Sequence, residues 1–257
     1  MPHHTLDPDH ERRFGGLDRL YGDGTRLTLR QARVAVVGVG GVGSWVVEAL
    51  ARSGIGHITL IDFDQVAVSN VNRQIQALDS TLGMAKVEAL RLRIADISPA
   101  CKVTLIEDFL TQENMAQLIA PASFDVVIDA CDEARVKAAL IVHARFNKIK
   151  LVVCGAAGGK REALNLRRDD LARSTHDALL ARIRTLLKKD FNIQPRSNGK
   201  FGVSCIYLAE PSQRSTSCAT GDLNCSGYGS SVMVTASMGF AAATWCVDTL
   251  LAARAAT

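Results

Sequence analysis

The sequence predicts an α/β protein built on a doubly wound, mostly parallel sheet. Short apolar segments alternate with longer amphipathic ones as far as residue 154. The short segments are almost continuously apolar, as expected of strands buried on both faces. The first of them runs into a glycine-rich turn and then a helix, the arrangement that opens a nucleotide-binding βαβ unit. Right-handed crossovers between such units wind helices onto both faces of one sheet.

The individual elements follow from the local pattern. Strands are predicted where apolar runs are short, at 33–38, 57–62, 103–106, 125–130 and 150–154. Helices are predicted where apolar residues recur every three or four positions, at 44–53, 84–97, 113–119 and 133–147. After a glycine-rich loop at 155–159 we expect one further strand, a helix over 177–189 and a Ser/Gly/Thr-rich loop over 210–229.

The change in pattern near residue 158 suggests two parts. We expect a core with an N-terminal arm in residues 1–158, and an extension in residues 159–257. The stretch 223–247 contains no charged residue, but seven Asn, Ser and Thr residues make it only weakly apolar. A membrane span needs about 20 predominantly apolar residues. A buried terminal helix is therefore favoured over a membrane span.

Composition narrows the class of protein. The chain has 257 residues, 47% of them hydrophobic, and its seven scattered cysteines include no C-x-x-C pair. Neither a disulfide framework nor a four-cysteine zinc site is indicated. The N-terminal residues are polar and charged, without the apolar core of a signal peptide. We expect a cytoplasmic protein.

Positive charge is concentrated in one segment. Residues 160–200 contain eleven lysines and arginines against five acids, whereas the whole chain has a net charge of +4. The remaining residues therefore carry a net charge of −2. Such a segment is either a solvated helix face or a surface for a polyanion, and charge alone leaves both open.

The glycine-rich turn indicates a nucleotide. Gly38, Gly40 and Gly43 have the G-x-G-x-x-G spacing, and Asp62 follows 19 residues later at the end of the second strand. Glycines let the backbone approach phosphates, the helix N-terminus supplies N–H donors, and the acid binds ribose hydroxyls. These features suit several nucleotides, so an NAD-dependent oxidoreductase and a non-catalytic nucleotide-binding scaffold both remain alternatives.

Three further features favour ATP over a nicotinamide dinucleotide. The segment "DFDQVAVSNVNRQ" contains an arginine whose guanidinium matches the oxygens of a polyphosphate. Lys86 lies in the first turn of a helix, where its ammonium can reach the same phosphates. Asp129 and Asp132 follow a strand, and carboxylates beside phosphates suit Mg²⁺. The polar candidates near the nucleotide are Asp62, Asp64, Asn70, Arg73, Gln74 and Lys86.

The segments "GVGGVGSW", "IDFDQVAVSNVNRQ", "GMAKVEAL" and "VIDACDE" together resemble the ATP-dependent activating enzymes that include MoeB, ThiF and ubiquitin-activating E1. The resemblance covers about residues 11–158 and implies adenylation of a carboxylate by Mg-ATP. It implies that Gly41 and its neighbours contact the phosphates and that Asp62 binds ribose. Arg73 and Lys86 would hold the polyphosphate near Asn70, and Asp132 would carry the magnesium ion.

A narrower resemblance spans nearly the whole chain. The segments "RFGGLDRLYG", "KAALIVHARFNKIKLVVCGAAGG", "SNGKFGVSCIY" and "NCSGYGSSVMVTASMGF" are similar to the branch that dehydrates threonylcarbamoyladenosine in tRNA. That branch implies adenylation of the threonyl carboxylate and cyclisation with loss of AMP. The basic segment would then contact tRNA, through Lys160, Arg161, Arg182, Arg184, Lys188 and Lys189.

The resemblance leaves several points open. Cys225 falls where some relatives have a reactive cysteine, and it is either an assistant in transfer or a spectator thiol. The relatives imply a homodimer, but the second arginine of the MoeB-type R-Y-x-R-Q segment is missing here, where Arg13 or Arg19 are the candidates to replace it. Adenylation of a small sulfur-carrier protein, with a sulfur-transfer partner, is the alternative within the same superfamily.

Overall fold

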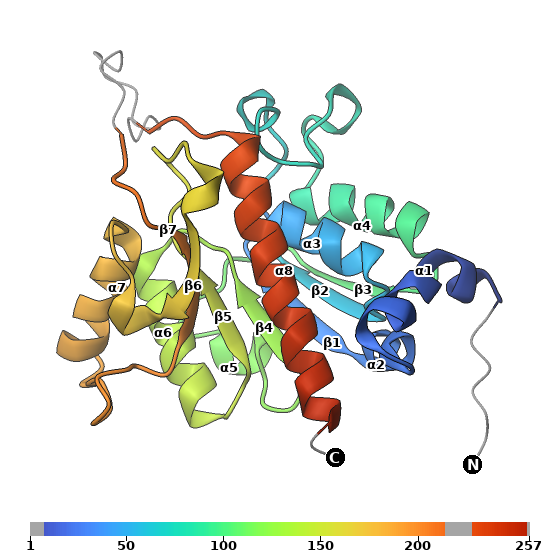
Figure 1. Ribbon diagram of the computed structural model, residues 1–257. Coiled ribbons are helices and arrows are strands. Elements are labelled where there is room, and N and C mark those ends of the chain that lie inside the picture. Colours follow the sequence, from blue (N-terminus) through green and yellow to red (C-terminus); the bar gives the residue numbers. More distant parts are fainter. Residues whose placement is uncertain (1–7, 214–227, 256–257) are drawn as a thin grey trace.

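A computed structural model describes residues 8–213 and 228–255. Seven strands form one sheet in the order β3-β2-β1-β4-β5-β7-β6 (Figure 1). All neighbours are parallel except β6, which runs antiparallel to β7 at the edge. The strands are β1 (Arg33–Val37), β2 (His57–Ile61), β3 (Lys102–Ile106), β4 (Val126–Asp129), β5 (Leu151–Cys154), β6 (Leu166–Asp170) and β7 (Ser204–Leu208).

Helices cover both faces of this sheet (Figure 1). The helices are α1 (Pro8–Tyr21), α2 (Thr25–Gln31), α3 (Gly43–Arg52), α4 (Lys86–Ile97), α5 (Met115–Leu118), α6 (Ala134–Phe146), α7 (Ala178–Lys189) and α8 (Val232–Ala255). Short 3₁₀ turns occur at η1 (Val68–Asn70), η2 (Asp79–Thr81), η3 (Ala163–Asn165) and η4 (Leu171–Arg173). The predicted α/β fold is confirmed, and its five predicted strands and five predicted helices lie close to their predicted bounds.

Alternate residues of each strand enter different parts of the core. Val34 and Val36 of β1 pack in the cluster that includes α3, α4 and α8, whereas Ala35 and Val37 pack on the other face with α5 and α6. All four residues are buried. Burial on both faces explains why these strands are nearly continuous apolar runs in the sequence.

The C-terminal residues complete the sheet of the N-terminal part. Strand β7 pairs with β5, and β6 extends the same sheet. Helix α8 crosses the sheet and packs closely on α3, where a Cβ at Gly239 would lie 2.8 Å from the carbonyl oxygen of Val42. The division at residue 158 stays a prediction about function, since residues on both sides of it share one hydrophobic core.

Helix α8 corresponds to the uncharged stretch near the C-terminus. Its length and apolar composition alone would allow it to cross a membrane. However, Val234, Met238, Ala242 and Cys246 are buried in the core between α8 and the sheet. This periodic burial is that of a core helix, as the sequence predicted, although the helix begins at residue 232 and continues to 255.

Candidate functional site

The turn between β1 and α3 is compact because two of its positions admit only glycine. Gly38 has a φ of 78°, and a Cβ there would lie 2.7 Å from the backbone nitrogen of Cys131. A Cβ at Gly43 would lie 1.9 Å from the carbonyl oxygen of Gly38. The turn therefore packs directly against the end of β4, and it brings the N-terminus of α3 to the carboxyl edge of the sheet.

The Asp62 carboxylate holds this turn in place. Its two oxygens accept hydrogen bonds from the backbone nitrogens of Val39, at 2.8 Å, and Asp64, at 2.9 Å. Asp62 is only half-buried and borders the large cavity described next. A carboxylate oxygen accepts more than one hydrogen bond, so Asp62 retains acceptor capacity for ribose hydroxyls.

A cavity of about 1790 Å³ opens at this edge of the sheet. It brings together almost every residue predicted to bind the nucleotide. Gly43 is the exception, because it lies behind the turn and supports it. The predicted residues that line the cavity are Gly38, Gly40, Gly41, Asp62, Asp64, Asn70, Arg73, Gln74, Lys86 and Asp132.

Arg73 lies against the glycine turn. A Cβ at Gly41 would lie 3.6 Å from its Cδ, so the side-chain stem passes over the turn. One guanidinium nitrogen donates to the carbonyl oxygen of Ser69, at 2.6 Å, and to Oδ1 of Asn72, at 2.9 Å. The backbone carbonyl of Arg73 accepts a bond from Trp45 Nε1. These bonds fix the arginine beside the surface that a phosphate would approach.

Lys86 is the first residue of α4 and is buried, and its Nζ lies 2.7 Å from Oδ2 of Asp64. Asp64, predicted only as a nucleotide-binding residue, is thus also the partner of this ammonium. The Asp64 side chain is 56% exposed, so its attraction is screened by water. A polyphosphate entering the cavity would meet an ammonium held by one largely solvated carboxylate.

Asn70 and Gln74 are both buried at the cavity wall and have structural bonds as well. Oδ1 of Asn70 accepts from the backbone nitrogen of Ala67, and Oε1 of Gln74 accepts from Nε2 of Gln76. Gln76 in turn donates to the carbonyl oxygen of Val39 in the glycine turn. The segment after β2 is therefore tied to the turn by side-chain amides.

The two acids at the end of β4, Asp129 within the strand and Asp132 after it, have different roles. Asp132 is exposed to the cavity, and within residues 8–213 and 228–255 its carboxylate makes no hydrogen bond or ion pair. Asp129 is wholly buried, with Oδ1 2.9 Å from Nζ of Lys137. The expectation that Asp129 helps to hold magnesium is wrong, because its carboxylate faces the core.

Lys137 is a buried residue that sequence reasoning missed. It is 0% exposed, and its Nζ also donates to the carbonyl oxygen of Asp129 at 3.1 Å. Burial alone would lower the pKa of Lys137, but the adjacent Asp129 carboxylate raises it, so the ammonium stays charged. Cys131, whose backbone nitrogen donates to Oδ1 of Asp129, completes a turn that positions the segment before Asp132.

The described residues contain no cluster of three or more His, Cys, Asp or Glu side chains that could hold a metal ion. Magnesium commonly binds through one or two carboxylates together with phosphate oxygens. Asp132 is a carboxylate at the edge of the cavity without a protein partner, as far as the described residues extend. The residues present therefore fit Mg²⁺ bound jointly with a polyphosphate.

The basic segment divides into buried and exposed residues. Lys160 is only 2% exposed, and its ammonium donates to the carbonyl oxygens of His176, Leu208 and Glu210. Predicting Lys160 as a tRNA contact was wrong, because these bonds hold it inside the protein. Arg184 is half-buried and bonds to Ser174 and to the carbonyl oxygen of Leu171.

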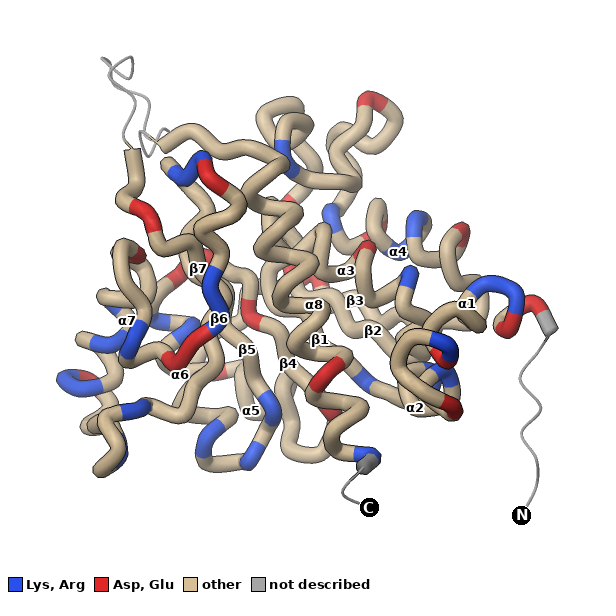
Figure 2. The backbone as a smooth tube through the Cα atoms, in the orientation of Figure 1, with Lys and Arg blue, Asp and Glu red and all other residues tan. Residues whose placement is uncertain are grey.

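The other predicted tRNA contacts are on the surface. Helix α7 begins with residues that line the cavity and carries basic residues along its outer side (Figure 2). Cys225 lies outside the described residues. The exposed basic candidates are Arg161, Arg182, Lys188 and Lys189.

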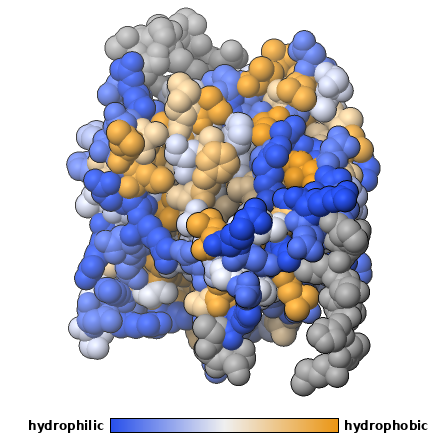
Figure 3. Space-filling view, turned by 45° about the vertical axis from the view of Figure 1, so that its right-hand side comes forward, coloured by the Kyte–Doolittle hydropathy of each residue, from blue (hydrophilic) through white to orange (hydrophobic). Residues whose placement is uncertain are grey.

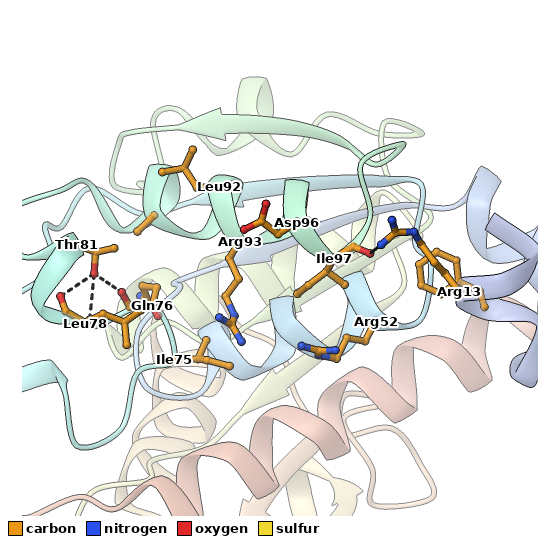
Figure 4. A pocket seen from close by; sticks show the side chains of 12 residues that line it. Arg13, Arg52, Ile75, Gln76, Leu78, Thr81, Leu92, Arg93, Asp96 and Ile97 are labelled. Atoms are coloured by element: carbon orange, nitrogen blue, oxygen red, sulfur yellow. Dashed lines mark hydrogen bonds between the residues drawn. The ribbon is translucent and has the colours of Figure 1, made fainter. Parts of the chain in front are cut away.

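A second hollow, of about 610 Å³, lies between α3 and α4 near the end of α1 (Figure 4). Arg52 and Arg93 line it, and both guanidinium groups bond to the buried Glu48. Arg13 lines it from α1 and donates to the carbonyl oxygen of Ile97. These arginines are engaged within the protein and lie apart from the glycine turn.

In the described part of the chain, one cavity is thus lined by a glycine turn, the acid after β2, Arg73, Lys86 and the unpaired acid after β4. A model of the ThiF family matches residues 16–254. The chain belongs to the ThiF family. Relatives named tRNA threonylcarbamoyladenosine dehydratase, from Haemophilus influenzae and Escherichia coli, are 42% and 45% identical to it over 95% of each chain.

Solved structures agree with this placement. The crystal structure of the E. coli tRNA N6-threonylcarbamoyladenosine dehydratase in complex with ATP has a TM-score of 0.91 at 43% identity, covering 98% of this chain and 99% of that chain. The same enzyme has also been solved with AMP, at a TM-score of 0.92. A relative named for a different activity, the E. coli molybdopterin-synthase adenylyltransferase, is 38% identical over 50% of this chain and 51% of its own.

Proposed function

We propose that this protein catalyses the ATP-dependent dehydration of N6-threonylcarbamoyladenosine in tRNA. The observation that carries this is the similarity over nearly the full length to enzymes of that name, at 42% and 45% identity. The cavity at the carboxyl edge of the sheet supplies the corresponding chemistry. An NAD-dependent oxidoreductase is not favoured, since the similar solved enzyme binds ATP.

The reaction has two balanced steps. A threonyl carboxylate oxygen attacks the α-phosphorus of ATP, and pyrophosphate leaves. The carbamoyl group of the same side chain then attacks the acyl carbon, a proton leaves the carbamoyl nitrogen, and AMP departs with the former carboxylate oxygen. The net change in the nucleoside is the loss of one water. Because this attack is intramolecular, correct orientation can supply up to about 7–11 kcal/mol of the barrier reduction.

We assign the residues of the cavity to these steps. Gly38, Gly40 and Gly41 allow the phosphates to approach the backbone, and Asp62 accepts bonds from ribose hydroxyls. Arg73 and Lys86 neutralise the charge that develops on pyrophosphate as it leaves. The support is that Arg73 packs against Gly41 of the glycine turn and that Lys86 lines the same cavity beside Asp64.

Magnesium, when bound, would further neutralise the phosphates and polarise the α-phosphorus. We propose that Asp132 holds it. The support is its carboxylate, which lines the cavity and lacks a partner among the described residues. The buried Asp129 is paired with Lys137 and also accepts a bond from the backbone nitrogen of Cys131, which fixes the turn from which Asp132 extends.

We further propose that tRNA lies along α7, where its phosphates meet exposed basic residues. Replacing Lys188 and Lys189 with Ala should weaken tRNA binding. The slope of log affinity against log salt should become shallower by roughly 0.7–0.9 for each phosphate that is no longer neutralised. A matched control is the double Ala replacement of Lys148 and Lys150, two exposed lysines beside the amino end of β5. Equal effects of the two double variants on affinity and salt slope would contradict this placement.

A homodimer is also part of the proposal. The face turned forward in Figure 3 carries hydrophobic patches among hydrophilic groups. On α8, Met233 is 66% exposed and Phe240 is 47% exposed, the latter in edge-to-face contact with Trp45. Arg13 of α1, whose side chain is 38% exposed, is the candidate for an arginine that acts in the partner's site, where it would exchange its bonds to Asp9 and Ile97 for a phosphate. Sedimentation analysis tests the dimer, and an Arg13→Ala variant tests the arginine.

The competing function is adenylation of the C-terminus of a small sulfur-carrier protein, followed by transfer to a sulfur-transfer partner. The similarity to an adenylyltransferase of that class covers only half of this chain. ATP–pyrophosphate exchange separates the two functions. We expect exchange with tRNA bearing threonylcarbamoyladenosine and none with a carrier protein ending in Gly-Gly. Exchange with the carrier alone would overturn the proposal.

The role of Cys225 stays a prediction. Because the second step is intramolecular, the chemistry does not require an enzyme nucleophile. A Cys225→Ser variant that turns over at the wild-type rate would show that the thiol is a spectator. The rates of cyclisation and of adenylate formation should both be compared between this variant and the wild-type protein.

A further inference from the structure

The cavity is larger than a nucleotide requires. Small-molecule sites usually occupy about 300–1000 Å³, and this one measures about 1790 Å³. Its first half is walled by the glycine turn and the segments after β2 and β4. Its second half is walled by residues beyond β5 that no part of the proposed nucleotide site uses. These include Gly155–Gly158, His176–Leu179, Arg184, Pro211 and Tyr228.

His176 lies in this second wall and has an unusual backbone conformation. Its φ of 54° is in the left-handed region, which a residue other than glycine retains only where its surroundings hold it. Nζ of the buried Lys160 donates to its carbonyl oxygen at 2.5 Å. The next residue, Asp177, accepts from the backbone nitrogens of Ala156 and Leu180, at 2.9 Å each.

These bonds tie the start of α7 to the loop after β5, at a place where His176 lines the cavity. The His176 side chain is exposed, and in the described parts of the chain it makes no hydrogen bond. A neutral imidazole donates from one ring nitrogen and accepts at the other. A carbamoyl group offers the matching pair, an N–H donor and a carbonyl acceptor.

We propose that the second half of the cavity is the subsite for the modified nucleoside, and that His176 hydrogen-bonds its carbamoyl group there. This inference rests on the proposed function. The two halves belong to one continuous cavity, so a nucleoside in the second half can direct its carboxylate toward a nucleotide in the first. A base turned out of a tRNA loop is the form in which proteins usually read single-stranded RNA.

The test compares the binding of two tRNAs, with threonylcarbamoyladenosine or with plain adenosine at the same position. An α,β-methylene ATP analogue is included so that no turnover occurs. We expect the wild-type protein to bind the modified tRNA more tightly. His176→Ala should reduce that preference about tenfold, the effect of losing hydrogen bonds to one group, without changing affinity for unmodified tRNA or the ATP analogue. His176→Gln, which keeps a donor and an acceptor, should retain most of the preference.

Asn192→Ala is the matched control, because Asn192 also has a left-handed φ, of 53°, and is exposed but does not line the cavity. An unchanged preference in His176→Ala, or an equal loss in Asn192→Ala, would overturn the subsite. Loss of affinity for both tRNAs alike would overturn it as well. A wild-type protein that adenylates no modified tRNA would instead refute the proposed function, and the subsite with it.

Discussion

The buried pair of Asp129 and Lys137 gives a quantitative prediction. Both side chains are 0% exposed, and Oδ2 of Asp129 has no hydrogen-bond partner among the described residues. Lys137→Met would leave Asp129 as a buried carboxylate without its cation. Removing one partner of a buried ion pair commonly costs about 3–5 kcal/mol. We therefore expect Lys137→Met to lower the free energy of unfolding by about this amount.

A second variant, at Asp129, tests the effect of the charge while it leaves the packing of the side chain nearly unchanged. Asp129→Asn keeps an acceptor for the backbone nitrogen of Cys131, a bond of 3.2 Å, but removes the charge. Alone, it should also be strongly destabilising, because Lys137 then lacks its counter-charge. The double variant removes both charges and should be more stable than the sum of the single effects predicts. We expect a coupling energy of at least about 2 kcal/mol.

Urea unfolding of the four proteins, followed by circular dichroism, measures these free energies. ATP–pyrophosphate exchange on the same proteins reports whether the turn before Asp132 is intact. The reasoning would be refuted if Lys137→Met lowered the free energy of unfolding by less than about 1 kcal/mol, or if the two single effects simply added. Either result would mean that the pair is not the buried, mutually dependent contact described above.

Three further predictions concern the turn, the metal and pH. Gly43→Ala should abolish ATP binding measured by calorimetry, since its Cβ would lie 1.9 Å from the Gly38 carbonyl oxygen; wild-type affinity would refute the glycine requirement. Asp132→Asn should leave the melting temperature unchanged but slow adenylation by roughly 100-fold or more, and a smaller effect would remove Asp132 as the magnesium ligand. Burial alone would raise the pKa of Asp170, but bonds from four backbone nitrogens lower it. The ionised Asp170 should therefore stabilise the fold fully above about pH 4, and this stabilisation should disappear as the pH falls through the lowered pKa. In Asp170→Asn the free energy of unfolding should depend less on pH in that range. The same pH dependence in the variant and the wild-type protein would contradict this.

Much of the fold could be predicted because its strands are buried on both faces. Val34, Val36 and their neighbours form short apolar runs, and the spacing of Gly38, Gly40 and Gly43 marks the first turn. Strands β6 and β7 were harder to predict from the sequence. Arg167 and Arg168 lie within β6, at an exposed sheet edge, so that strand lacks an apolar pattern.

The site residues could be predicted where they belong to recognisable sequence motifs. Arg73 and Lys86 lie between β2 and the first turn of α4, and they line the cavity with Asp62. The misassignments came from burial, which charge patterns do not show. Lys160 was grouped with surface basic residues, yet it bonds to carbonyls up to 50 residues away. One sign in the sequence pointed to their pairing: Asp129 and Lys137 are opposite charges that lie on either side of the start of α6.

The mass of the nucleoside product is the decisive measurement for the proposed function. The protein is incubated with magnesium, ATP and tRNA bearing threonylcarbamoyladenosine, and the tRNA is then digested and analysed by mass spectrometry. We predict a nucleoside lighter by one water, formed only with ATP and together with AMP. An unchanged nucleoside mass, in a preparation that still binds ATP and the tRNA, would contradict it.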